Sequence, residues 1–109
     1  MTELRAHAGR SLGICVSTPG GIGHVLGLVA AAARAGVSSE VFLTGDGVRL
    51  IRDRRFPALV ATARVSVCDS SYRAAGLAGE VETGLADKDF VTQWRNAEMV
   101  ERCDRYLIL

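Results

Sequence analysis

The sequence has no excess of charge of either sign. Its 109 residues include 13 Lys and Arg and 12 Asp and Glu, which gives a formal net charge of +1. Proteins that bind nucleic acid or an anionic membrane surface through electrostatics need a concentrated basic patch. The arginines are instead spread along this chain, so we expect neither nucleic acid nor a membrane among its partners.

A long hydrophobic run is also missing. The most apolar stretch, Ile22 to Ala35, is about fourteen residues long, short of the roughly twenty that a helix needs to cross a bilayer. The first ten residues are polar and contain no apolar segment of signal-peptide length. The sequence therefore predicts a cytoplasmic protein with an N-terminal tail, residues 1–10, and a single domain, residues 11–109.

The residue spacing of a metal site is missing as well. Cys15, Cys68 and Cys103 lie far apart in the sequence, form no Cys-x-x-Cys pair and are accompanied only by His7 and His24. An odd number of cysteines in a reducing compartment is typical of free thiols. We expect no bound metal.

Short apolar runs alternate with helical patterns along the chain. The runs predict strands at 11–17, 40–45, 65–67 and 105–109, and the patterns predict helices at 22–35, 48–55, 58–63, from Ser70 and from Asp87. Strands that alternate with helices favour a parallel sheet with helices on both faces, so we expect an α/β fold.

Two of these helices carry further predictions from their apolar faces. The helix at 22–35 has almost no polar face before Arg34, which predicts burial on a second side, against another subunit. In the helix from Asp87, apolar residues recur at helical spacing, and we expect them to pack on the sheet, with the tryptophan in the core. These residues are Phe90, Val91, Trp94, Ala97 and Val100.

A glycine-rich turn connects the first strand to the first helix. Backbone N–H groups in such a turn can hold an anion, which makes Gly20, Gly21, Gly23 and His24 candidate binding residues. The turn also has a purely structural interpretation, a tight connection that lets the helix lie close to the sheet. Its glycine spacing differs by one residue from the dinucleotide-binding fingerprint, and no Lys-Ser or Lys-Thr follows as in a P-loop.

The main candidate for chemistry is Cys68, which ends a short apolar run. The carboxyl edge of a parallel sheet is where ligands collect, and N–H groups at a helix start stabilise a thiolate. Asp69 acts in the other direction, because a neighbouring carboxylate raises the pKa of a thiol. Ser70, Ser71 and Arg73 are candidate binding residues around the sulfur. The alternative is an unreactive core thiol.

Three passages of the sequence resemble a known family. They are the first strand with its glycine-rich turn, the segment Val65-Ser66-Val67-Cys68 that leads to Arg73 and Gly76, and the terminal Met99-Val100-Glu101-Arg102-Cys103-Asp104-Arg105-Tyr106-Leu107-Ile108-Leu109. In this order they resemble the DsrE/DsrF-like family of small sulfur-relay proteins. The resemblance covers most of the chain from about Ser11.

The resemblance implies a three-layer α/β/α domain with a mainly parallel sheet of about five strands. It implies assembly into homo-oligomers, trimers or hexamers, or into hetero-oligomers with related subunits. In relay members a cysteine at the position of Cys68 accepts sulfane sulfur as a persulfide and passes it to the next protein, without a cofactor. Those members tend to have small or apolar residues where this chain has Asp69, Ser70 and Ser71.

The predicted function is that of a sulfur carrier or sulfurtransferase with Cys68 as the nucleophile, and its partners are a sulfur donor and an acceptor protein. The alternative is a non-catalytic oligomeric module that binds a small anion or nucleotide at the Gly20 to Gly23 turn. A dinucleotide-dependent oxidoreductase is disfavoured by the glycine spacing and by the lack of a substrate domain.

Overall fold

The computed structural model describes residues 9–80 and 82–109. Five parallel strands form one sheet in the order β4-β3-β2-β1-β5. The strands are β1 (Ser11–Val16), β2 (Ser38–Leu43), β3 (Arg64–Cys68), β4 (Phe90–Val91) and β5 (Arg105–Ile108). His7 and most of the predicted tail lie outside the described residues.

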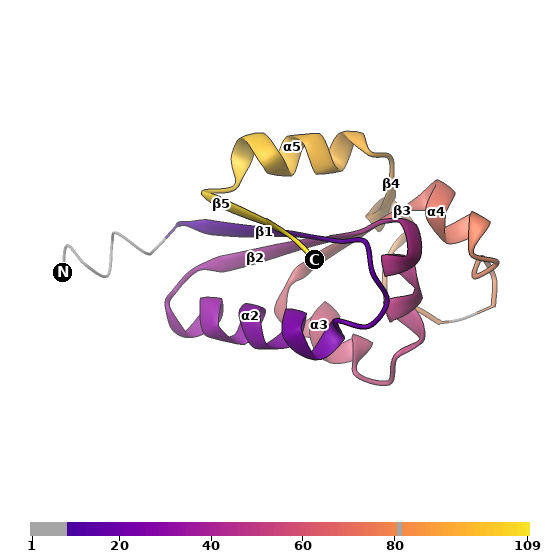
Figure 1. The fold of residues 1–109 in the computed structure, drawn as a ribbon, viewed down its shortest axis with the longest axis horizontal. Helices are drawn as coiled ribbons and strands as arrows, with labels where there is room; N and C mark the ends of the chain where they lie inside the picture. Colours follow the sequence, from indigo (N-terminus) through magenta and orange to yellow (C-terminus); the bar gives the residue numbers. More distant parts are fainter. Residues whose placement is uncertain (1–8, 81) are drawn as a thin grey trace.

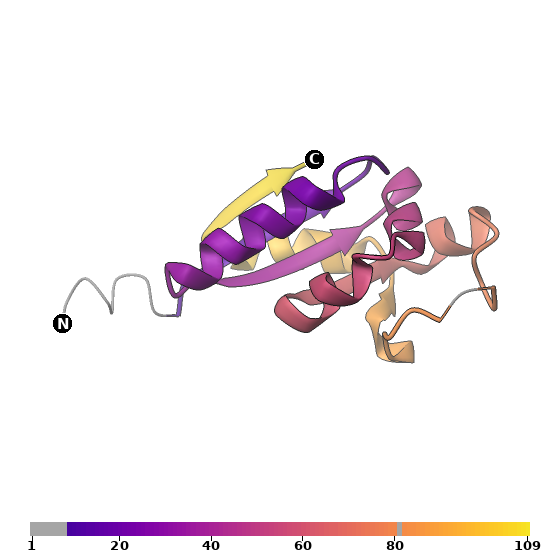
Figure 2. The same ribbon diagram turned by 90° about the horizontal axis from the view of Figure 1, so that it is seen from below.

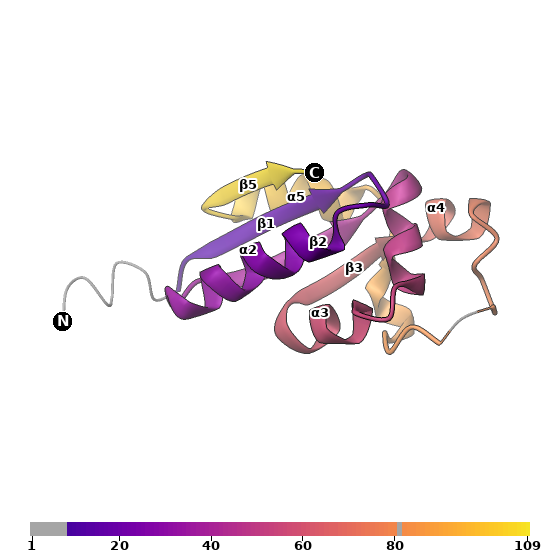
Figure 3. The same ribbon diagram turned by 60° about the horizontal axis from the view of Figure 1, so that its bottom comes forward.

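Helices cover both faces of the sheet, as Figure 1 shows. Helices α2 (Ile22–Arg34) and α3 (Phe56–Thr62) lie on one face, and α5 (Trp94–Arg102) lies on the other. Figures 2 and 3 look onto the first face, where α2 and α3 run beside each other. The predicted α/β class with a three-layer arrangement is confirmed.

The alternation of side chains along the strands creates two separate cores. Buried aliphatic residues of β1, β2 and β3 point toward α2 and α3; they are Ile14, Val16, Val41, Leu43, Val65 and Val67. The intervening residues point toward α5, where Cys15, Phe42 and Cys68 form a smaller cluster with Met99 and Cys103. All three cysteines therefore lie in one layer, under α5.

Helix α2 begins and ends close to its predicted bounds. It buries Ile22, Val25, Val29 and Ala32 against the sheet and leaves other apolar residues, including Ala30 and Ala33, exposed. The chain leaves the helix at Gly36, whose φ of +76° is readily adopted only by glycine.

The prediction for the segment from Asp87 is wrong in two respects. Phe90 and Val91 do not belong to a helix, because they pair with Val67 and Cys68 as strand β4. Helix α5 starts later, and its buried residue is Met99, while Trp94 is 72% exposed. The expected stripe therefore does not face the sheet, and the tryptophan is not in the core.

The predicted helix at 48–55 is the 3-10 helix η1 (Gly45–Arg52), and α3 starts at Phe56, earlier than expected. Pro57 stands in the first turn of α3, where the missing N–H group of proline has no helical partner to lose.

The carboxyl ends of β1, β2 and β3 meet at one edge of the sheet. Beyond this edge lie η1 and the short helix α4 (Asp69–Ala74), which contact each other (Figure 1). In η1, a Cβ atom on Gly47 would lie 2.0 Å from the carbonyl oxygen of Val16, so only glycine allows η1 to fold onto the end of β1.

Within residues 9–80 and 82–109, no helix has the length and apolar character needed to span a membrane. The same residues contain no group of three His, Cys, Asp or Glu side chains placed to hold a metal ion.

Candidate functional site

Cys68 is the last residue of β3 and lies directly before α4, as the sequence predicts. Its side chain points to the face covered by α5, because Val67 before it points to the opposite core. Only 2% of the residue is exposed. The sulfur is therefore enclosed on its apolar side by Phe42 and Met99 and bounded on its other side by the polar residues that follow it.

Two serine hydroxyls contact the sulfur. The Oγ of Ser70 lies 3.2 Å from the Sγ of Cys68, and the side chain and N–H group of Ser71, in the first turn of α4, also lower the pKa of the thiol. The Ser71 Oγ in turn accepts a hydrogen bond of 2.9 Å from the N–H of Gly45. This bond ties α4 to the start of η1 beside the sulfur.

A third donor comes from the other end of the chain. The side chain of Gln93, in the turn between β4 and α5, also lowers the pKa of Cys68, and its Nε2 donates a hydrogen bond to the Oγ1 of Thr44 at 2.7 Å. Sequence analysis did not find Gln93, because only the pairing of β4 with β3 brings it to this edge. No local pattern marks it.

These donors determine the acidity of the thiol. Burial by itself raises the pKa of Cys68, but the hydrogen bonds from Ser70, Ser71 and Gln93 outweigh it and lower the pKa to about 7. The thiolate is therefore much more populated at neutral pH than that of an ordinary cysteine. The carboxylate of Asp69, expected to oppose this, is paired with the Nε of Arg73 at 2.8 Å and is not among the causes of the shift.

The other two cysteines behave in the opposite way. Burial raises the pKa of Cys15, which is only partly offset by a hydrogen bond with Tyr106. Burial also raises the pKa of Cys103, against a weaker effect from Ser11. Among the three thiols, Cys68 is the one whose surroundings favour the nucleophilic thiolate.

The glycine-rich turn is not brought to the sulfur. It leads into α2, which covers the face of the sheet opposite to the one that the side chain of Cys68 faces. Gly20 and Gly21 face open space, Gly23 lies near the guanidinium of Arg55, and His24 is exposed. In the described part of the chain, no hydrogen bond or cavity joins these residues to Cys68.

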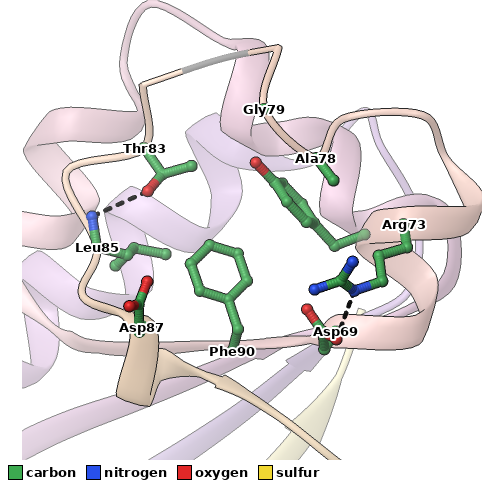
Figure 4. A pocket seen from close by; sticks show the side chains of 9 residues that line it. Asp69, Arg73, Ala78, Gly79, Thr83, Leu85, Asp87 and Phe90 are labelled. Atoms are coloured by element: carbon green, nitrogen blue, oxygen red, sulfur yellow. Dashed lines mark hydrogen bonds and ion pairs between the residues drawn. The ribbon is translucent and has the colours of Figure 1, made fainter.

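A cavity of about 500 Å³ lies between α4 and the segment that leads into β4. Figure 4 shows the ring of Phe90 in its centre, Asp87 below Leu85, and the guanidinium of Arg73 turned toward Asp69. The remaining wall comes from Tyr72, Ala78, Gly79 and Thr83. Asp69 lines this cavity but Cys68 does not, so Arg73 belongs to the cavity and not to the surroundings of the sulfur.

Comparisons with known proteins assign neither a family nor a function to this chain. No protein-family model, no curated protein and no solved structure matches the chain. Membership of the DsrE/DsrF-like family therefore stays a prediction.

Proposed function

We propose that the protein is a sulfur carrier or sulfurtransferase that holds sulfane sulfur as a persulfide on Cys68. The observation that carries this proposal is the hydroxyl of Ser70, 3.2 Å from the sulfur at the end of β3, in surroundings that lower the pKa of Cys68 to about 7. A thiolate that forms near neutral pH and is a good nucleophile is what attack on a sulfur donor requires.

The reaction needs no oxidant or reductant. The Cys68 thiolate attacks the outer sulfur of a donor persulfide, R–S–SH, and forms a new S–S bond. The S–S bond of the donor breaks at the same time, and the donor leaves as the thiolate R–S⁻. The proton of the outer sulfur stays with it, so the product is the Cys68 persulfide, which an acceptor thiolate then attacks in the same way.

Access to the sulfur is part of this proposal. Cys68 is 2% exposed, and its apolar side is covered by residues of β4 and α5, among them Val91 and Met99. A donor therefore reaches the sulfur when the turn that carries Gln93 moves away from Thr44. One hydrogen bond between these side chains, 2.7 Å long, fastens that turn to the end of β2.

The test is the intact mass of the protein after incubation with a sulfane-sulfur donor. We expect the wild type to gain one sulfur, about 32 Da, that a reductant removes, and Cys68→Ser to gain none. Cys15→Ser and Cys103→Ser are the matched controls and should load as the wild type does. A wild type that does not load, or a Cys68→Ser variant that loads equally, would contradict the proposal.

The cavity shown in Figure 4 favours a second candidate function, the binding of a small molecule without covalent chemistry. Its volume lies in the range of ligand pockets, and it combines an aromatic surface with charged groups. This function predicts that native mass spectrometry detects a retained ligand equally in the wild type and in Cys68→Ala.

We also propose that the chain self-associates through the exposed apolar side of α2. This side includes Ala30 and Ala33 and continues into an apolar groove lined by Leu28, Ala31 and Leu107. Light scattering should give a mass above that of the monomer, and Ala30→Glu should lower it. The control Ala97→Glu, on the exposed side of α5 across the sheet, should not. A monomeric wild type would refute this arrangement.

A further inference from the structure

Two buried hydroxyl groups in the described part of the chain have no hydrogen-bond partner: those of Ser39 and Ser66. Ser66 is 1% exposed and lies on β3, two residues before Cys68. Side chains two positions apart on a strand point to the same face. The Oγ of Ser66 is therefore on the face of Cys68, under α5, whereas Ser39 shares the face of Val41 and Leu43 toward α2 and α3.

An unpartnered buried hydroxyl destabilises a fold, and alanine or valine would avoid this cost on a strand. The neighbours of Ser66 on this face do not supply a partner. In the sheet register it lies opposite Phe42, and the cluster on this face consists of Phe42, Cys15, Cys68, Met99 and Cys103, with Val91 and Tyr106 packed against it. The hydroxyl proton of Ser66 is thus available to an acceptor that enters this layer.

A persulfide on Cys68 is such an acceptor. Once the S–H group of the new persulfide ionises, its negative charge lies on the terminal sulfur, about 2 Å from Sγ, and Sγ is only a weak acceptor. The hydroxyl of Ser70, 3.2 Å from Sγ, contacts the sulfur atom that becomes the weak acceptor. The terminal sulfur needs a donor of its own.

We propose that Ser66 is that donor: its Oγ–H hydrogen-bonds to the terminal sulfur of the Cys68 persulfide and holds it in the layer under α5. This inference rests on the proposed function. The Cβ atoms of residues two apart on a strand are separated by roughly 7 Å. The added S–S bond of about 2 Å extends the Cys68 side chain far enough for its terminal sulfur to reach the Ser66 hydroxyl. Met99, an unbranched and adaptable side chain of the same cluster, can shift to make room for the added sulfur.

The experiment measures how long the loaded protein keeps its sulfur. Wild type, Ser66→Ala and Ser39→Ala are loaded with a low-molecular-weight persulfide, the donor is removed, and the loss of about 32 Da is followed by intact mass. We expect the persulfide of Ser66→Ala to decay about tenfold faster than that of the wild type, because its charged terminal sulfur has lost a hydrogen bond. Ser39→Ala should decay at the wild-type rate.

A second measurement separates sulfur binding from an effect on the fold. The pKa of the unloaded Cys68 thiol should be the same in Ser66→Ala as in the wild type, since Ser66 is not among its donors. Equal persulfide lifetimes in Ser66→Ala and the wild type would overturn the role of Ser66. A lifetime in Ser39→Ala as short as that in Ser66→Ala would overturn it too. Both outcomes would leave the sulfur-carrier function standing. Failure of the wild type to load would overturn both proposals.

Discussion

At the scale of single residues, three thiols in one buried layer differ in acidity because their hydrogen-bond partners differ. For Cys15 and Cys103, burial outweighs the hydrogen bonds of Tyr106 and Ser11 and raises the pKa of each thiol. Cys68 is buried to a similar degree but stands where the strand ends and the polar turn begins. Hydrogen bonds from that turn favour the thiolate over the thiol.

This difference predicts the pH dependence of alkylation. For an acid with a lowered pKa, the charged form dominates above that pKa, so the alkylation rate of Cys68 should rise with pH to half its maximum near pH 7. The low exposure of the sulfur slows access of the reagent equally at every pH, so it lowers the absolute rate, whereas the midpoint follows the pKa of the thiol. Ser71→Ala should raise the midpoint by about one unit, since one hydrogen bond to a charged sulfur is lost.

The rate is followed with iodoacetamide and mass spectrometry of the Cys68 peptide. Ser17→Ala is the control, because the hydroxyl of Ser17 donates to the carbonyl of Leu109 at the end of another strand. A midpoint near the ordinary thiol value in the wild type, or the same midpoint in Ser71→Ala, would contradict the proposed donors.

At the scale of elements, α5 shows that the rotation of a helix relative to the sheet, as well as its periodicity, determines which of its residues are buried. Apolar residues recur along this segment, yet strand β4 takes up Phe90 and Val91, and the helix turns Met99 toward the sheet. A bidentate ion pair between Arg102 and the buried Glu40, with distances of 2.7 and 3.2 Å, anchors the end of the helix to β2. This rotation leaves Trp94 in solvent.

The rotation of α5 predicts which of its large residues stabilises the fold. Met99→Ala should lower the free energy of unfolding by about 3 kcal/mol, because it opens a cavity in the layer under α5. Trp94→Ala should lower it by less than about 1 kcal/mol, since a mostly exposed side chain has little burial to lose. Urea denaturation compares the two variants. A larger loss for Trp94→Ala would mean that the tryptophan packs on the sheet.

At the scale of the whole molecule, the all-parallel topology assembles the site. Every strand ends at the same edge of the sheet, so the segments after β2, β3 and β4 meet there although they are far apart in the sequence. Thr44, Cys68 and Gln93 come from these three segments and form one connected group. The same topology separates the glycine-rich turn from the sulfur, because α2 crosses one face and the sulfur lies on the other.

The sequence by itself determined the parallel α/β class, four of the five strands, the extent of α2 and the place of Cys68 at the end of a strand. Each of these depends on a local pattern: an apolar run, a helical period, or a glycine or proline that ends an element. Such patterns involve only residues close together in the sequence, so they can be recognised without knowing which distant residues pack against them.

Only the tertiary structure decided the existence of β4, the exposure of Trp94, the role of Gln93 and the unpartnered state of Ser66. A two-residue strand has no period of its own and forms only because Val67 and Cys68 offer it partners. The donors of a buried thiol likewise depend on which distant segments meet around it. Local sequence encodes the shape of each element, whereas strand register and helix rotation, which arise from packing the elements together, determine the chemistry at their junction.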